Sequence, residues 1–196
     1  MNLETMEYEP RKKAKFATLE AAKPIEDLKT RLKALVTGQD KAADFYRQFH
    51  YALFSYISHR VPEISDEIYR IDDAMMAGFG WEIGAFESWD VMGLARTTEA
   101  MKKAGFTVAP WIDEMIANGI SSFYKTENGK RLCYDVSSKS YKSLPGGDAF
   151  IVMKNFENQL LWKNSACRTY HLGDDVIGLE WYTKMGSIGG EVLEGI

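Results

Sequence analysis

The sequence lacks most of the features that would assign a function directly. Its 196 residues include no apolar run of about 18 residues, the length that a transmembrane helix requires. The N-terminal stretch MNLETMEYEPRKKAKF has no apolar core and is not a secretory signal. No GxSxG, HExxH or CxxC motif occurs, and no GxGxxG motif follows an expected strand. We therefore expect a cytoplasmic protein that has no membrane partner and no complete catalytic set of its own.

Cysteine, histidine and excess positive charge are also scarce. The two cysteines, Cys133 and Cys167, are compatible with one disulfide, but in an acidic chain without a signal they favour reduced thiols. His50 and His59 stand nine residues apart and miss the i, i+4 spacing of metal pairs, while His171 ends an expected strand. We expect structural or surface roles for all three and no metal site. The net charge of -4 argues against nucleic-acid binding.

What the sequence does contain is helical periodicity, over residues 23–120. Pro24 suits the first turn of a helix that ends at Gly38. The next helix ends before Pro62 and carries an apolar stripe with a period near 3.6 residues, made of Phe45, Phe49, Leu53 and Tyr56. Further helices are expected from the N-cap Ser65 to Gly78, over 86–92, over 94–103, and from Pro110 to Gly119. Together they predict a compact helical domain.

The flanking segments differ from this helical region. Residues 1–22 read as an extended arm, whose basic run Arg11-Lys12-Lys13 fits a solvated linker or a binding role. Residues 121–158 read as a β-hairpin about Asn128-Gly129, a loop over 137–150 and a strand over 150–156. Residues 159–196 contain two strands about Gly173-Asp174-Asp175 and a final helix start. The predicted fold class is therefore α+β, a mainly helical domain followed by β-hairpins.

The stretch 70–90, RIDDAMMAGFGWEIGAFESWD, is the most unusual part of the chain. It combines glycines and large aromatic residues with carboxylates. Asp72, Asp73, Glu82 and Glu87 include candidates for acid–base work, although carboxylates near helix ends more often cap helices or face solvent. The stretch is either a tightly packed corner between two helices or the edge of a binding site.

This stretch resembles the C-terminal helical domain of 3-hydroxyacyl-CoA dehydrogenases, in which a helix, a GxGPFE-like corner and another helix follow one another. The resemblance rests on the pattern ID-x-AM-x-x-GFGWE-x-G-x-FE-x-WD, which here begins at Ile71 and ends at Asp90. Large bacterial fusion enzymes of fatty-acid β-oxidation are the most similar. The family's proline is Ala85 here, which retains good helix propensity with slightly less rigidity.

The resemblance implies that the chain is a segment of a multifunctional enzyme. The dehydrogenase's NAD site and His–Glu pair would lie upstream, and residues 159–196 would be the truncated start of a crotonase-like hydratase domain. The segment would contain no catalytic, cofactor-binding or metal residue, whereas the parent enzyme would use NAD and acyl-CoA. Its partners would be other domains of the same polypeptide.

The corner would then be structural, and its two helices would approach closely where Gly78 and Gly80 lack side chains. The corner residues are Gly78, Phe79, Gly80, Trp81, Glu82, Gly84, Phe86, Glu87, Trp89 and Asp90. The alternative is an independent protein-interaction module that uses the aromatic corner 79–89 as its partner surface.

Overall fold

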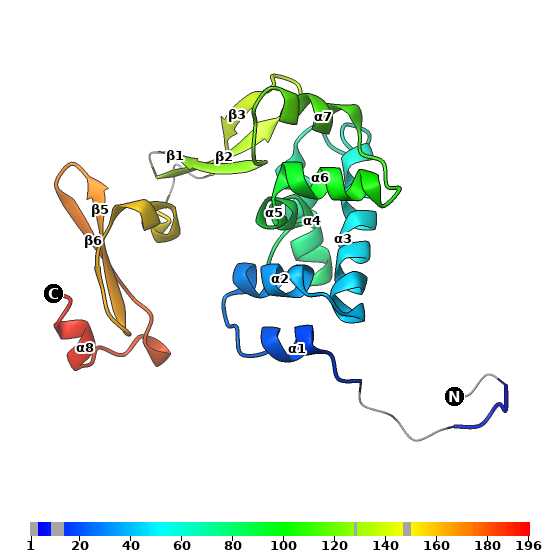
Figure 1. Cartoon of the computed structure of the whole chain (residues 1–196). Coiled ribbons are helices and arrows are strands. Elements are labelled where there is room, and N and C mark those ends of the chain that lie inside the picture. Colours follow the sequence, from blue (N-terminus) through cyan, green and yellow to red (C-terminus); the bar gives the residue numbers. More distant parts are fainter. Residues whose placement is uncertain (1–3, 9–13, 128, 147–149) are drawn as a thin grey trace.

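The computed structural model describes residues 4–8, 14–127, 129–146 and 150–196, which form a helical part followed by two small sheets (Figure 1). The helices of the helical part are α1 (Ala17–Ala22), α2 (Leu28–Thr37), α3 (Lys41–His59), α4 (Ile68–Phe79), α5 (Ala85–Met92), α6 (Leu94–Lys103) and α7 (Pro110–Ala117). The first sheet contains β1 (Tyr124–Glu127), β2 (Lys130–Asp135) and β3 (Ser140–Ser143). The second part contains η1 (Met153–Gln159), β4 (Leu160–Lys163), β5 (Cys167–Gly173), β6 (Val176–Trp181), η2 (Lys184–Gly186) and α8 (Gly190–Leu193). This mixture of helices and antiparallel strands agrees with the α+β class.

The end of the expected N-terminal arm is a packed helix. Within α1, the Thr18 amide donates to the Asp40 carboxylate over 2.9 Å, and the same carboxylate caps the first turn of α3. A Cβ at Gly38 would lie 2.0 Å from Thr18 Oγ1, so α1 lies tightly against the α2–α3 turn. The prediction of an extended arm is thus wrong for residues 17–22. The run Arg11–Lys13 lies outside the described residues.

The ends of α5, α6 and α7 match the prediction closely, whereas the start of α2 and both ends of α4 shift by a few residues. Helices α5, α6 and α7 occupy the expected segments. Helix α2 begins only at Leu28, because the Asp27 side chain accepts the Thr30 amide, and Pro24 therefore precedes the helix. Helix α4 begins after Glu67 instead of Ser65, and it ends at the left-handed Gly80 instead of Gly78.

The core of the helical part is aromatic. The ring of Phe54 stacks on Trp89 with 4.8 Å between ring centroids, and Phe123 packs against Phe86 at 4.9 Å. These four side chains are fully buried. They join α3, α5 and the segment that leads into β1, so the first sheet is attached directly to the helical core.

Helix α3 does not bury the face that its aromatic stripe indicates. The buried residues of α3 are Ala42, Ala43, His50, Tyr51, Phe54, Ile57 and Ser58. The stripe residues Phe45, Phe49 and Tyr56 are 68%, 44% and 60% exposed. The face of α3 that contains Phe54 packs against α5, and the adjacent face, which carries the aromatic stripe, remains on the surface.

The first sheet confirms the predicted hairpin and adds a strand. Strands β1 and β2 pair in antiparallel register from Tyr124 opposite Cys133 to Glu127 opposite Lys130, while Asn128 of the turn lies outside the described residues. Strand β3 pairs with β2 where a loop was predicted. The chain turns back because the Asp135 carboxylate accepts hydrogen bonds from Ser137 and Ser138.

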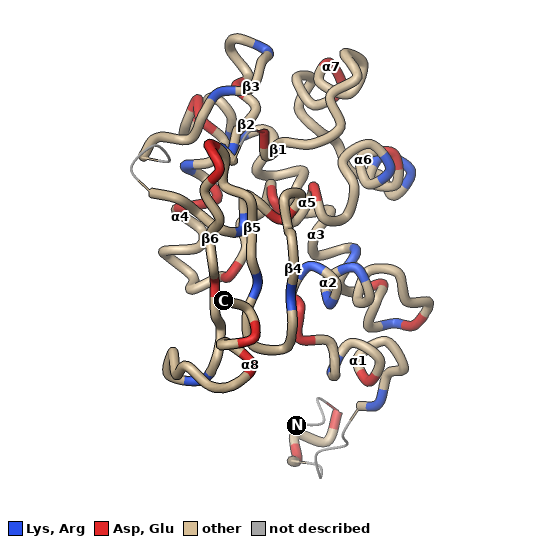
Figure 2. The backbone as a smooth tube through the Cα atoms, turned by 90° about the vertical axis from the view of Figure 1, so that its left-hand side faces the viewer, with Lys and Arg blue, Asp and Glu red and all other residues tan. Residues whose placement is uncertain are grey.

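The second sheet, β4-β5-β6, stands beside the helical part (Figures 1 and 2). Residues 160–172, predicted as one strand, form two, because the Asn164 side chain accepts the amides of Ala166 and Cys167 in a turn. The β5–β6 hairpin lies where it was predicted. The strand expected at 150–156 is absent from the described residues 150–156, and η1 begins at Met153. Asn155 Nδ2 of η1 donates to Gly129 O over 3.2 Å.

Two further properties of the described chain bear on function. Both cysteines are free and buried, Cys133 in β2 and Cys167 in β5. Among the described residues, no helix combines the length and the hydropathy needed to cross a membrane.

Candidate functional site

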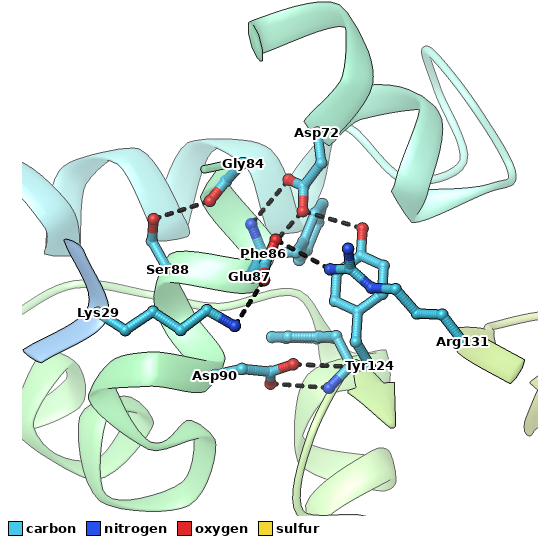
Figure 3. Close-up of polar contacts among 10 residues, drawn as sticks. Lys29, Asp72, Gly84, Phe86, Glu87, Ser88, Asp90, Tyr124 and Arg131 are labelled. Atoms are coloured by element: carbon cyan, nitrogen blue, oxygen red, sulfur yellow. Dashed lines mark hydrogen bonds and ion pairs between the residues drawn. The ribbon is translucent and has the colours of Figure 1, made fainter. Parts of the chain in front are cut away.

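The corner between α4 and α5 is closed by one buried carboxylate. Asp72 of α4 reaches the first turn of α5, where its oxygens accept the amides of Phe86 at 2.8 Å and Glu87 at 3.1 Å (Figure 3). These amides have no partner inside their own helix, so the carboxylate satisfies them and opposes the positive end of the helix dipole. A Cβ at Gly84 would lie 2.2 Å from Asp72 Cγ. Glycine at 84 therefore permits this carboxylate–helix contact.

A second buried carboxylate holds the first sheet against the helices. Asp90 of α5 accepts the amides of Phe123 at 2.8 Å and Tyr124 at 2.9 Å. The Tyr124 hydroxyl donates to Asp72 over 2.9 Å. Tyr124 thus donates its main-chain amide to Asp90 and its side-chain hydroxyl to Asp72 (Figure 3). The pair connects α4, α5 and β1.

Glu87 forms the charged side of this cluster. Its two oxygens meet Lys29 Nζ of α2 at 2.8 Å and Arg131 Nη2 of β2 at 2.9 Å. The guanidinium of Arg131 also lies 4.6 Å from the ring centroid of Tyr124, in cation–π geometry. Burial raises the pKa of Glu87, but the hydrogen bond from Lys29 and the charge of Arg131 outweigh it and hold this pKa below its ordinary value.

The pKa values of the two more deeply buried carboxylates, Asp72 and Asp90, shift in the opposite direction from that of Glu87. Burial raises the pKa of Asp72 to about 6, although three donors favour its charged form. Burial raises the pKa of Asp90 to about 7, and the nearby charge of Asp72 contributes to that rise. Such values suit proton transfer near neutral pH. Both Asp90 oxygens, however, accept main-chain amides, which is the geometry of a structural clamp.

The remaining corner residues divide between core and surface. Phe86 and Trp89 are fully buried, whereas Phe79 is 72% exposed and Glu82 is exposed. Apart from the adjacent residues and the backbone of α4 itself, no described atom lies within 4 Å of a Cβ placed at Gly78 or Gly80. The expectation of close helix approach at Gly78–Trp81 is therefore wrong. The close approach occurs at Gly84.

The other candidate residues remain apart from this cluster. Asp73 is exposed. Burial lowers the pKa of His50, whose Nδ1 lies 2.7 Å from Tyr46 O, and His59 Nδ1 lies 2.8 Å from Ser55 O. His171 is exposed on β5. Within the described part of the chain, no group of three or more His, Cys, Asp or Glu residues could hold a metal ion.

An apolar groove with a volume of about 670 Å³ runs between α3 and α4. It contains part of the α3 stripe and the exposed part of the corner. Trp81 joins the two sides, with its ring centroid 6.4 Å from Phe49 and 6.1 Å from Phe79. The lining residues are Phe49, Leu53, Tyr56, Ile57, Arg60, Ile64, Ser65, Arg70, Ile71, Ala74, Met75, Phe79 and Trp81. The surface of the groove is predominantly apolar.

Sequence reasoning missed three residues of the carboxylate cluster, namely Lys29, Tyr124 and Arg131. Each comes from a segment outside the 70–90 stretch, and the Tyr124–Asp72 contact spans 52 residues. The predicted hairpin was the only signal for Tyr124 and Arg131, and it gave no indication of their partners.

Comparison with known proteins gives one informative similarity. The chain is 34% identical over 192 residues to a probable 3-hydroxyacyl-CoA dehydrogenase of Bacillus subtilis (strain 168). The match covers 97% of this chain and 24% of that protein, so the chain spans about a quarter of the length of this relative. No family model and no solved structure matches the chain.

Proposed function

We propose that the chain acts as a non-catalytic helical scaffold in an NAD-dependent 3-hydroxyacyl-CoA dehydrogenase of fatty-acid β-oxidation. The similarity to the Bacillus subtilis protein supports this proposal, because it extends over nearly the whole chain but only a quarter of the relative. NAD and the 3-hydroxyacyl-CoA would then be held mainly by other domains of the same polypeptide, and this segment would help to enclose the acyl-CoA.

The observation that carries the scaffold role is the apolar groove between α3 and α4. Continuous exposed apolar surface marks interaction sites more often than it marks free surface. A groove between two helices fits an amphipathic helix, which would place apolar side chains at i, i+3, i+4 and i+7 into it. The occupant that we propose is a helix of a neighbouring domain in the same polypeptide.

We extend the proposal to the second sheet. Residues 159–196 would begin an enoyl-CoA hydratase domain of the crotonase type. Strands β4 and β6 are the outer strands of the sheet and carry exposed apolar side chains, including Leu161, Ile177 and Trp181. Such edges are suited to further strands or to a covering element.

The second candidate function is an independent protein-interaction module. Exposure of Phe79 and the position of Trp81 in the groove favour it. Because Phe86 and Trp89 are buried, the part of the corner available to such a partner is 79–82.

The test is a chimera in which this chain replaces the matched 192 residues of the Bacillus subtilis protein. The assay is NAD-dependent oxidation of a 3-hydroxyacyl-CoA. We expect the chimera to be active and its Phe79→Asp variant to lose most of that activity. The control variant Phe150→Asp should retain the activity of the chimera. The two substitutions are matched because the rings of Phe79 and Phe150 are 72% and 73% exposed. A folded but inactive chimera would contradict the scaffold role. An active chimera that is insensitive to Phe79→Asp would favour the interaction module.

A further inference from the structure

A second cavity, of about 350 Å³, lies between the helical part, the first hairpin and η1. Four cationic side chains line it from four different elements: Lys29 from α2, Lys125 from β1, Arg131 from β2 and Lys154 from η1. Its volume falls within the range of small-ligand sites, at their lower end. The convergence of cations from separate elements distinguishes it from the apolar groove.

The ion pairs around this cavity do not neutralise all of its cations. Glu87 is shared by Lys29 and Arg131, so one carboxylate faces two positive charges. Lys154 forms no ion pair with a described carboxylate, although the hydrogen bonds from Thr30 and, after them, the charges of Lys154 and Lys29 lower the pKa of Asp27. Lys125, by contrast, pairs with Glu127 at 2.7 Å.

Besides Glu87, two further acidic residues of the wall oppose this positive charge. Glu157 is one of them. The other is Asp90, whose two oxygens accept main-chain amides. Lys29, Arg131 and Lys154 therefore face Glu87, Glu157 and an Asp90 that is already engaged.

We propose that this cavity binds the phosphate groups of a nucleotide-type ligand. Phosphate oxygens accept several charge-assisted hydrogen bonds, and the planar guanidinium of arginine suits them particularly well. Nη2 of Arg131 meets Glu87 at 2.9 Å, and a guanidinium carries five N–H donors in all. Lys29 of α2 and Lys154 of η1 supply further charge, and Thr126 is also part of the lining.

The source of the phosphate follows from the proposed function, on which this part of the inference rests. In an acyl-CoA enzyme, the ligand would be the phosphate-rich adenosine end of coenzyme A. The apolar acyl end would remain in other domains. The phosphate chemistry itself would be the same for a free nucleotide.

The experiment is a calorimetric titration of the full chain with inorganic pyrophosphate, coenzyme A and pantetheine at low salt. We expect saturable binding of pyrophosphate and coenzyme A, no binding of pantetheine, and weaker binding as salt rises. Lys154→Gln should weaken binding about tenfold, since hydrogen bonds to charged groups are among the stronger ones. Lys142→Gln is the matched control, because Lys142 pairs with Asp135 at 2.9 Å and does not line this cavity.

Each outcome decides the proposal. Pyrophosphate binding without coenzyme A binding would retain the phosphate site and assign it to a smaller phosphate ligand. Absence of saturable binding by a cooperatively folded chain would overturn the site, as would equal weakening by Lys154→Gln and Lys142→Gln. The chimera assay measures scaffold function separately, so an active chimera with no phosphate binding would reject this site alone.

Discussion

Phe86→Ala tests whether the α4–α5 corner is part of the core. The Phe86 side chain is fully buried, with ring centroids 4.9 Å from Phe123 and 6.1 Å from Trp111. Truncation of a buried phenylalanine loses its transfer free energy and leaves a cavity, which together amount to about 3–5 kcal/mol. The amide of residue 86 would still reach Asp72, so the loss would come from the ring alone. We expect a decrease of about 4 kcal/mol in the free energy of unfolding.

The assay is equilibrium unfolding in urea, followed by tryptophan fluorescence and by circular dichroism. Phe79→Ala is the matched control, because it removes the same ring from a position that is 72% exposed. The control should change the free energy of unfolding by no more than about 0.5 kcal/mol. Similar effects of the two substitutions, or a loss below about 1 kcal/mol for Phe86→Ala, would refute the assignment of this ring to the core.

Three further predictions concern the carboxylate clamp and its corner. Gly84→Ala should destabilise the fold by about 1–3 kcal/mol, because the added methyl group overlaps with Asp72. Gly78→Ala should instead stabilise helix α4 by about 0.5–1 kcal/mol, because alanine is the better helix former and no side chain lies in its way. Thermal unfolding measures both effects. Folding raises the pKa values of Asp72 and Asp90 from 3.8 to about 6 and about 7. The folded state therefore binds more protons than the unfolded state between about pH 4 and pH 7. The contribution of these two groups to the free energy of unfolding should decline as pH rises through this range. Asp90→Asn should flatten that decline in urea titrations at several pH values, and an unchanged slope would contradict it. Tyr124→Phe should cost about 1–3 kcal/mol, because a donor to buried Asp72 is lost, and should raise the Asp72 pKa in an NMR titration.

The elements that local signals define could be predicted from the sequence. The left-handed Gly105 and Gly119 follow the ends of α6 and α7, and α7 begins at Pro110. The β1–β2 hairpin follows from its Asn-Gly turn. In these cases the residue that ends or turns the chain lies within the element's own sequence, so no distant partner is required.

The α3 stripe shows where such reasoning stops. The 3.6-residue period correctly identified a helix, but it could not say which of two adjacent apolar faces another element covers. The actual buried face contains Phe54 and Ile57, while Phe45 and Phe49 remain exposed. The choice depends on packing against α5, which the α3 sequence does not contain.

The corner was similarly recognised but assigned to the wrong glycines. Its composition indicated a close approach, and the structure has one at Gly84. The partner that requires glycine is the Asp72 side chain, 12 positions earlier in the chain. The Tyr124 hydroxyl completes the same clamp across 52 residues. Contacts of this separation follow from the tertiary fold and carry no local sequence pattern.

The positions of the two cysteines give the chain a pair of built-in reporters. Cys133 is in the first sheet and Cys167 in the second, and their exposed fractions are 5% and 0%. A thiol reagent can modify each one only when its own sheet opens, so labelling rates measure local opening. Because the labelled peptides differ, one mass-spectrometric time course would give separate opening free energies for the two sheets of the unmodified sequence. Local opening of the first and of the second sheet can thus be followed without any substitution.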